Sequence, residues 1–192
     1  SCPKLFDASR SMLGGTQERW LEAALARSEA RWNLVAQQTP MAQFDQKPGP
    51  GQSFWTDGWD GYPAARKRLL DFVHSRKIRN PVVIGGDVHS FNVSDLKEDF
   101  DDPASPTVAS EFVGTSITAQ AWPHARLLEV LPDNPHIRFA DGRQRGYVRV
   151  ELTPGLWRAD LRAMKSVQQR DAPCSTLASF VVEDGRPGAL KA

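Results

Sequence analysis

An aspartate, a histidine and a serine follow a short apolar segment near the middle of the chain. The segment NPVVIGGDVHS, residues 80–90, places Asp87, His89 and Ser90 directly after β-branched residues and a pair of glycines. In an extended chain, residues two apart point to the same side, so the Asp87 and His89 side chains could face one point in space. A carboxylate oxygen and an imidazole nitrogen together would be half of a metal site. An Asp after a strand is also a common turn former or helix cap, and a single His is often a hydrogen-bonded structural residue, so both interpretations stay open.

These side chains need a sheet to position them. Residues 82–84 are β-branched and lie between turn-forming residues, which is typical of a central strand covered on both faces. A further strand is expected over residues 32–38 and a helix over residues 62–77. Strand, loop, helix and strand in this order predict a right-handed crossover with two parallel strands in one sheet. Ligands bind in the crevice outside the carboxyl ends of such strands, which is where Asp87 and His89 would lie.

The remaining elements complete a mixed arrangement. A helix is expected over residues 15–32, with Thr16 as its N-cap. Residues 45–61 are dense in Pro, Gly and Asp and predict a long loop, a feature that is more often functional than not. After His89, period-two alternation and turn residues predict a largely antiparallel second half. The strands expected there are residues 110–118, 136–141, 145–153, 157–164 and 176–185, with a short helix over 124–131.

Composition limits the classes of function. A length of 192 residues suits one domain, or part of a larger one. The 24 Lys and Arg residues balance 23 Asp and Glu residues, so the sequence has no electrostatic footprint for nucleic acid or an anionic membrane. No long apolar stretch predicts a membrane span, and the first 20 residues lack the apolar segment of a signal peptide. The two cysteines, Cys2 and Cys174, exclude a disulfide scaffold, and their spacing leaves open whether they pair.

Several stretches taken together resemble the alkaline phosphatase D (PhoD-like) family, a branch of the calcineurin-like metallophosphoesterases. The stretches are SRSMLGGTQERWL, WNLVAQQTPMAQFD, DGWDGYPAARKRLLDF, VVIGGDVHS, EFVGTSIT, NPHIRFADGRQRGYVRVELT and ASFVVEDGRPG. They span nearly the whole chain, and together they are far more specific than any one alone. The resemblance implies an α/β (α+β) fold in which residues 1–192 form the C-terminal half of a four-layer αββα metallophosphatase-like sandwich. Its sheet would be mixed, with antiparallel C-terminal strands.

The same resemblance implies that an N-terminal half is missing. Family members carry most of their metal ligands ahead of the region that matches residues 9–13: an early strand-end ligand, a GD-x-x-Y type motif and a later Asp-His/Asn motif. None of these motifs occurs in this sequence. Two ligands cannot hold a two-metal centre, so we expect the chain alone to be inactive or nearly so. Cutting a sheet between its halves also exposes a strand edge and apolar faces, which predicts either self-association or pairing with the N-terminal half.

The resemblance also assigns chemistry to GGDVHS, which matches the last metal-ligand motif of the superfamily. Asp87 would hold a calcium ion and His89 an iron ion, because carboxylate oxygen suits calcium and imidazole suits iron. Ser90 would orient His89. Two metals would lower the pKa of a bridging water, so that hydroxide attacks phosphorus without a side-chain nucleophile. The implied function is metal-dependent hydrolysis of phosphoric monoesters or diesters, in the periplasm or outside the cell.

Other polar residues are weaker candidates. Asp60 and Tyr62 are candidates for the cleft wall, or else a turn former and a packed aromatic residue. His136, Arg138 and Arg145 are candidates for gripping a phosphate, or else cap turns and cover strands. For the whole chain, the competing hypothesis is a non-catalytic binding or assembly module that kept the sheet and lost the site. A GD-x-x-Y motif ahead of this sequence would favour the enzyme.

Overall fold

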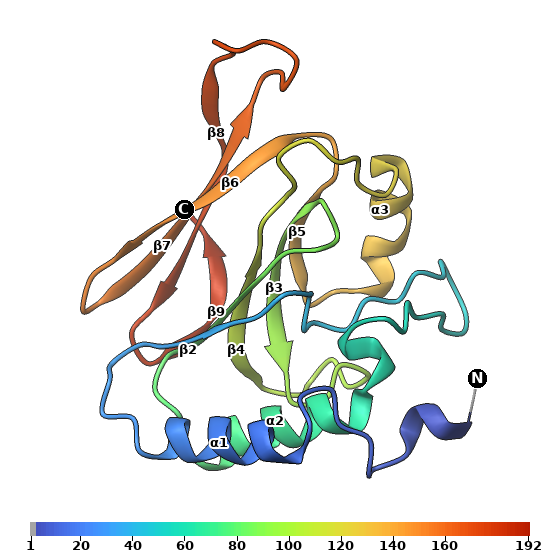
Figure 1. Cartoon of the computed structure of the whole chain (residues 1–192), viewed down its shortest axis with the longest axis vertical. Coiled ribbons are helices and arrows are strands. Elements are labelled where there is room, and N and C mark those ends of the chain that lie inside the picture. Colours follow the sequence, from blue (N-terminus) through green and yellow to red (C-terminus); the bar gives the residue numbers. More distant parts are fainter. Residues whose placement is uncertain (1–2) are drawn as a thin grey trace.

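The chain, seen here in a computed structural model that describes residues 3–192, is built in three layers (Figure 1). Helices α1 (Gly15–Ala26) and α2 (Pro63–Ser75) cover one face of a five-stranded sheet. A four-stranded sheet packs against the other face. The predicted mixed α/β class, with a mixed sheet and antiparallel C-terminal strands, is confirmed.

The five-stranded sheet holds the predicted parallel pair. Its strands are β1 (Asn33–Ala36), β2 (Pro81–Gly85), β3 (Phe91–Lys97), β4 (Thr107–Val113) and β5 (Ile137–Asp141), in the order β1-β2-β4-β3-β5. Strands β1, β2 and β4 run parallel, and β3 is antiparallel to both β4 and β5. The carboxyl ends of three parallel strands therefore meet at one edge of the sheet.

The second sheet is an antiparallel meander. Its strands are β6 (Arg145–Leu152), β7 (Leu156–Met164), β8 (Cys174–Glu183) and β9 (Arg186–Lys191), paired in chain order. The buried side chains between the two sheets include Phe91, Val93, Phe112, Trp157, Leu161 and Phe180. Strand β9 also joins the sheets through its main chain, because Gly188 N donates to Ser110 Oγ (3.0 Å) and Ala189 N donates to Asp95 Oδ1 (2.9 Å).

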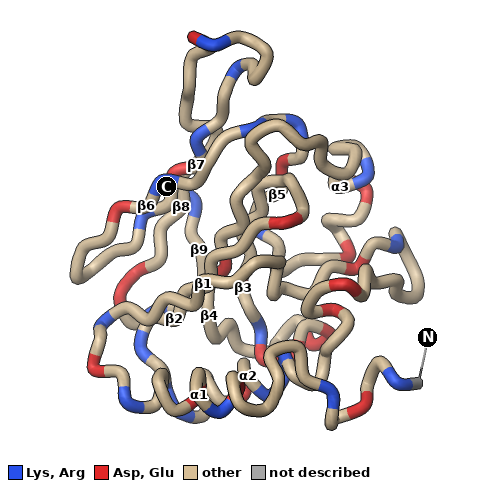
Figure 2. The backbone as a smooth tube through the Cα atoms, viewed as in Figure 1, with Lys and Arg blue, Asp and Glu red and all other residues tan. Residues whose placement is uncertain are grey.

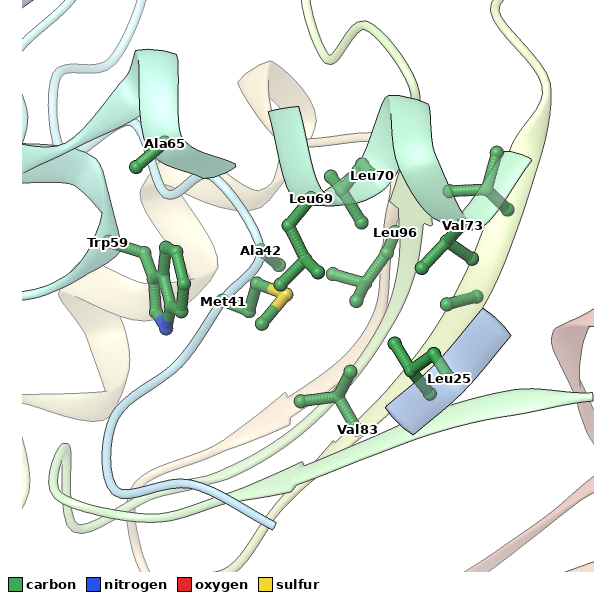
Figure 3. Close-up of a cluster of buried hydrophobic side chains, with 12 residues drawn as sticks. Leu25, Met41, Ala42, Trp59, Ala65, Leu69, Leu70, Val73, Val83 and Leu96 are labelled. Atoms are coloured by element: carbon green, nitrogen blue, oxygen red, sulfur yellow. The ribbon is translucent and has the colours of Figure 1, made fainter. Parts of the chain in front are cut away.

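A second apolar cluster fixes the helices. Figure 3 shows Leu69, Leu70 and Val73 of α2 pointing toward Leu96 of the sheet, with Leu25 of α1 nearby. Each such side chain stabilises the fold by about 1.5–3 kcal/mol when fully buried. This cluster holds α2, and with it the loop that precedes α2, against the sheet.

The structure corrects several boundaries. Helix α1 ends at Ala26 rather than at residue 32, and Thr16 is not its cap: the N-cap position is Gly14, which makes no side-chain capping bond. Strand β4 ends at Val113, so residues 114–118 are not strand. Strands β3 and β9 were not predicted. The short helix is present as α3 (His124–Val130), and the loop over residues 45–61 is regular only in the 3-10 turn η2 (Trp59–Gly61).

Charges of both signs are intermingled along the chain. Figure 2 shows Lys and Arg interspersed with Asp and Glu over both sheets and the helices. No helix within residues 3–192 is long and apolar enough to cross a bilayer. Cys174 lies half-buried at the start of β8, whereas Cys2 lies outside the described residues, so the structure does not test their pairing.

Candidate functional site

Asp87 and His89 lie in the loop between β2 and β3. Both have left-handed backbone angles, with φ of 73° and 59°. Val88 N donates to Gly86 O (2.9 Å), which makes Asp87 the central residue of a γ-turn with positive φ, a rare and strained conformation. The backbone of this segment is therefore not extended, and the expected reason for the two side chains to face one point is wrong. Both residues nevertheless line the same cavity.

Main-chain contacts bind this loop to its neighbours. Gly86 N donates to Gln38 O after β1 (2.9 Å), and Gly114 N after β4 donates to Gly85 O (2.9 Å). A side chain at Gly85 would meet Thr39 O at 3.1 Å, so the close approach favours glycine. The ends of β1, β2 and β4 are thus joined at one point, which is the crevice where ligands bind in such sheets.

The His89 ring is oriented by a main-chain carbonyl. Its Nδ1 lies 3.0 Å from Gln120 O. Because a carbonyl only accepts, Nδ1 carries the proton and Nε2 is left as an acceptor, the arrangement typical of a metal-binding histidine. The partner of the ring is therefore Gln120 rather than Ser90, whose Oγ accepts a hydrogen bond from Asn92 Nδ2 (3.3 Å). Ser90 is buried at the cavity wall.

Arg145 donates hydrogen bonds to the main chain of the same loop and of the segment before β6. Its Nη1 donates to the carbonyl oxygens of His89 (3.4 Å), Gly142 (3.2 Å) and Gln144 (2.8 Å). Thr115 Oγ1 donates to the His89 carbonyl as well (2.8 Å). Arg145 does not line the cavity. Its hydrogen bonds hold the main chain around His89.

The cavity has a volume of about 360 Å³ and combines carboxylates with aromatic side chains. Its apolar lining includes Pro40, Phe44, Trp55, Trp59, Trp122, Leu127 and Ile137. Its acidic lining residues are Asp60, Asp87 and Glu111. No Lys or Arg is among the residues of the described chain that line it. Asp60 is paired with Arg66 and Glu111 is fully buried, so an anion such as phosphate would meet the Asp87 carboxylate with no Lys or Arg side chain among these lining residues unless cations were bound.

Glu111 is a buried carboxylate in the middle of β4. It is fully buried and accepts hydrogen bonds from the main-chain N–H groups of Met41 (2.5 Å) and Ala42 (3.0 Å). Burial raises the pKa of Glu111 to about 7, against the effect of these two donors. Glu111 thereby holds the segment after β1 that forms one wall of the cavity.

Asp60 borders the cavity, and its carboxylate is paired. Arg66 Nη1 lies 2.5 Å from Asp60 Oδ1, and Phe44 N donates to Oδ2 (3.0 Å). Burial raises the pKa of Asp60, while the Arg66 guanidinium opposes that rise. Arg66 is itself buried and also donates to Met41 O (3.2 Å). Tyr62 does not line the cavity; the Arg10 guanidinium lies 4.7 Å from the centre of its ring.

His136 and Arg138 lie away from the cavity. His136 Nε2 lies 2.6 Å from Gln43 O, and burial lowers the pKa of His136 to about 4, so the ring is neutral at pH 7. Arg138 forms an ion pair with the buried Asp95 (2.5 Å). Neither side chain borders the cavity that Asp87 lines.

No group of three or more His, Cys, Asp or Glu side chains within residues 3–192 is arranged to hold a metal ion. Asp87 and His89 therefore remain the two candidates that the structure places at one cavity. Sequence reasoning missed Gln120, Glu111 and Arg66. Of these, only Glu111 had a visible signal, a carboxylate within the apolar run AS-E-FV.

Comparison with known proteins identifies the family. A family model described as PhoD-like phosphatase matches residues 1–161. The chain belongs to the PhoD-like phosphatase family. It is 41% identical over 186 residues to alkaline phosphatase D of Bacillus subtilis (strain 168), covering 95% of this chain and 32% of that protein. The chain thus spans about a third of the length of this relative.

Solved structures agree with the assignment to the PhoD-like family. A structure described as PhoD superposes with a TM-score of 0.89 at 41% identity, over 96% of this chain and 36% of that chain. A purple acid phosphatase, PPD1 from yellow lupin (Lupinus luteus) seeds, superposes with a TM-score of 0.56 at 14% identity. That match covers 88% of this chain and 28% of the lupin chain, and at this identity it shows a shared fold alone.

Proposed function

We propose that this chain supplies Asp87 and His89 to a two-metal centre that hydrolyses phosphoric esters. Membership of the PhoD-like family supports phosphoester hydrolysis. The charge of the cavity carries the metal part of the proposal, because the exposed Asp87 carboxylate lines it and no Lys or Arg of the described residues does. A phosphate group needs cations at such a site, and bound metals are the way to provide them.

The donor set fits the two metals. The Nε2 atom of His89 is left as an acceptor and suits iron, while the exposed Asp87 carboxylate suits calcium. When bound, the metals supply Lewis acidity and a water of lowered pKa. The chain's own residues position the ligands: Gln120 holds the His89 ring, Arg145 holds its main chain, and Glu111 holds the facing wall. His136 and Arg138 have no part in this proposal, because they lie away from the cavity.

The remaining ligands must come from elsewhere, and an exposed apolar strip supports the N-terminal half of the domain as their source. Leu34 of β1 pairs with the core residue Val82, and Leu152 of β6 pairs with the core residue Trp157, yet Leu34 is 51% and Leu152 52% exposed. Trp32 Nε1 donates to Thr153 O (3.0 Å), so β1 begins beside the β6–β7 turn. Both sheets are therefore open on this side, where an N-terminal half or a second copy would bury these side chains.

The test is hydrolysis of bis-p-nitrophenyl phosphate and p-nitrophenyl phosphate by the chain joined to the N-terminal half of its domain, with calcium and iron supplied. Asp87→Ala and His89→Ala should abolish turnover and retention of metal after dialysis. The matched controls Asp57→Ala and His74→Ala remove exposed side chains of the same types outside the cavity and should leave both unchanged. Equal turnover in all four variants would refute the assignment.

A second outcome would favour the other candidate function. If the chain binds no metal and hydrolyses no ester, alone or with an N-terminal half supplied, it acts as a non-catalytic binding or assembly module.

The resemblance to exported enzymes also leads us to propose a location in the periplasm or outside the cell. Fractionation of the cells that make the protein would test this.

A further inference from the structure

We infer that the apolar side of the cavity selects phosphoric esters whose alcohol part is a flat aromatic group. The inference rests on the proposed function, since the same cavity is lined by Asp87 and His89. Its basis is a set of three side chains, Phe44, Trp55 and Trp122, which we call the aromatic wall. They border the same space as the two metal-ligand candidates.

The aromatic wall is preformed. The rings of Phe44 and Trp122 meet edge to face, with centroids 6.0 Å apart and planes at 79°, a favourable arrangement for aromatic pairs. The Phe44 main chain is fixed by its N–H bond to Asp60 (3.0 Å), and the Arg126 guanidinium lies 5.7 Å from the Trp122 ring centre. An arriving ring therefore meets a surface that needs little ordering, which favours tight binding.

Part of the aromatic lining of the cavity is exposed to solvent and could contact a bound ligand. Trp55 is 41% exposed and borders the cavity. At about 360 Å³, the cavity lies within the range of small-molecule sites, which are mostly apolar with a few placed polar groups. A phosphate held near Asp87 and His89 would leave its alcohol part to contact these rings.

The test separates binding from turnover. We would titrate the chain, joined to the N-terminal half of its domain and with calcium and iron present, with 1-naphthylphosphonate and with methylphosphonate, neither of which is an ester. The naphthyl probe should bind at least about tenfold more tightly. Trp122→Ala should remove most of that preference, whereas Trp122→Phe, which keeps a flat ring, should retain it. Trp20→Ala removes an exposed indole on α1 and serves as the control.

Equal affinities for the two probes, no detectable binding of the naphthyl probe, or equal losses in Trp122→Ala and Trp20→Ala would each overturn the inference. Hydrolysis of 1-naphthyl phosphate and of glycerol 2-phosphate by the same joined protein then separates the inference from the proposed function. If both esters are hydrolysed equally well, the inference fails and the proposed function stands. If neither is hydrolysed but the naphthyl probe binds selectively, the aromatic wall binds such groups and the proposed function fails.

Discussion

Replacing Glu111 by Gln should change how the free energy of unfolding depends on pH. Burial raises the pKa of Glu111 from 4.5 to about 7. Between these values the folded protein keeps a proton on Glu111 that the unfolded chain has released. The free energy of unfolding therefore falls by about 1.4 kcal/mol for each pH unit as pH rises, or about 3 kcal/mol over the whole interval. A Gln side chain is neutral at every pH and removes this loss.

His136 acts in the opposite direction over much of the same range. Burial lowers the pKa of His136 from 6.5 to about 4, so here the unfolded chain binds the proton that the folded protein excludes. The free energy of unfolding rises by about 1.4 kcal/mol per pH unit between these values. The two slopes oppose each other in the native protein, and Glu111→Gln should expose the slope due to His136.

Urea unfolding followed by tryptophan fluorescence measures the effect, at steps of about one pH unit across the interval. The variant should gain stability relative to the native protein as pH rises, by about 3 kcal/mol in all. Glu151→Gln, which removes an exposed carboxylate on β6, serves as the control and should change the free energy of unfolding by less than about 0.5 kcal/mol at each pH. If the difference in free energy of unfolding between Glu111→Gln and the native protein does not grow as pH rises, the claim that a buried carboxyl keeps its proton is refuted.

Asp60→Asn should lower the free energy of unfolding by about 3–5 kcal/mol, because it leaves the buried Arg66 unpaired. Asp71→Asn breaks an exposed pair and should cost less than about 1 kcal/mol; equal losses in urea would contradict the difference. Asp87→Gly and Asp87→Ala both remove the carboxylate, but Ala keeps a Cβ in the left-handed region and should be less stable by about 1 kcal/mol, which thermal unfolding would detect. Gly61→Ala should reduce the yield of folded protein, since its Cβ would lie 2.0 Å from a main-chain oxygen; normal expression and an unchanged melting temperature would count against this.

The parallel half of the first sheet could be predicted because its signals are local. Strand β2 is an apolar β-branched run between turn residues, and α2 has a regular apolar stripe. Strand β3 could not be predicted, because Asn92, Ser94 and Asp95 interrupt its apolar residues. Asn92 and Ser94 face the cavity, and Asp95 is satisfied by Arg138 and β9, which lie far along the sequence.

The candidate site was predictable to a similar extent. Asp87 and His89 stand out by residue type and by their place after a strand. The group that orients the His89 ring is a main-chain carbonyl, that of Gln120, and main-chain groups leave no signal in residue types. The arginines and His136 were candidates for phosphate by their chemistry alone. Their hydrogen bonds and ion pairs depend on contacts between distant segments, which only the folded chain displays.

The two sheets are joined in part by β9, which is the last of their strands to be synthesised. Residues 186–191 leave the ribosome after every other strand of the two sheets, yet their main chain supplies N–H groups to Asp95 and Ser110. A nascent chain that has reached only β8 already holds every residue of the cavity. In such a chain the Asp95 carboxylate and the Ser110 hydroxyl still lack the N–H donors of β9. A premature stop codon just before β9 would therefore spare the candidate ligands and still prevent the two sheets from locking together.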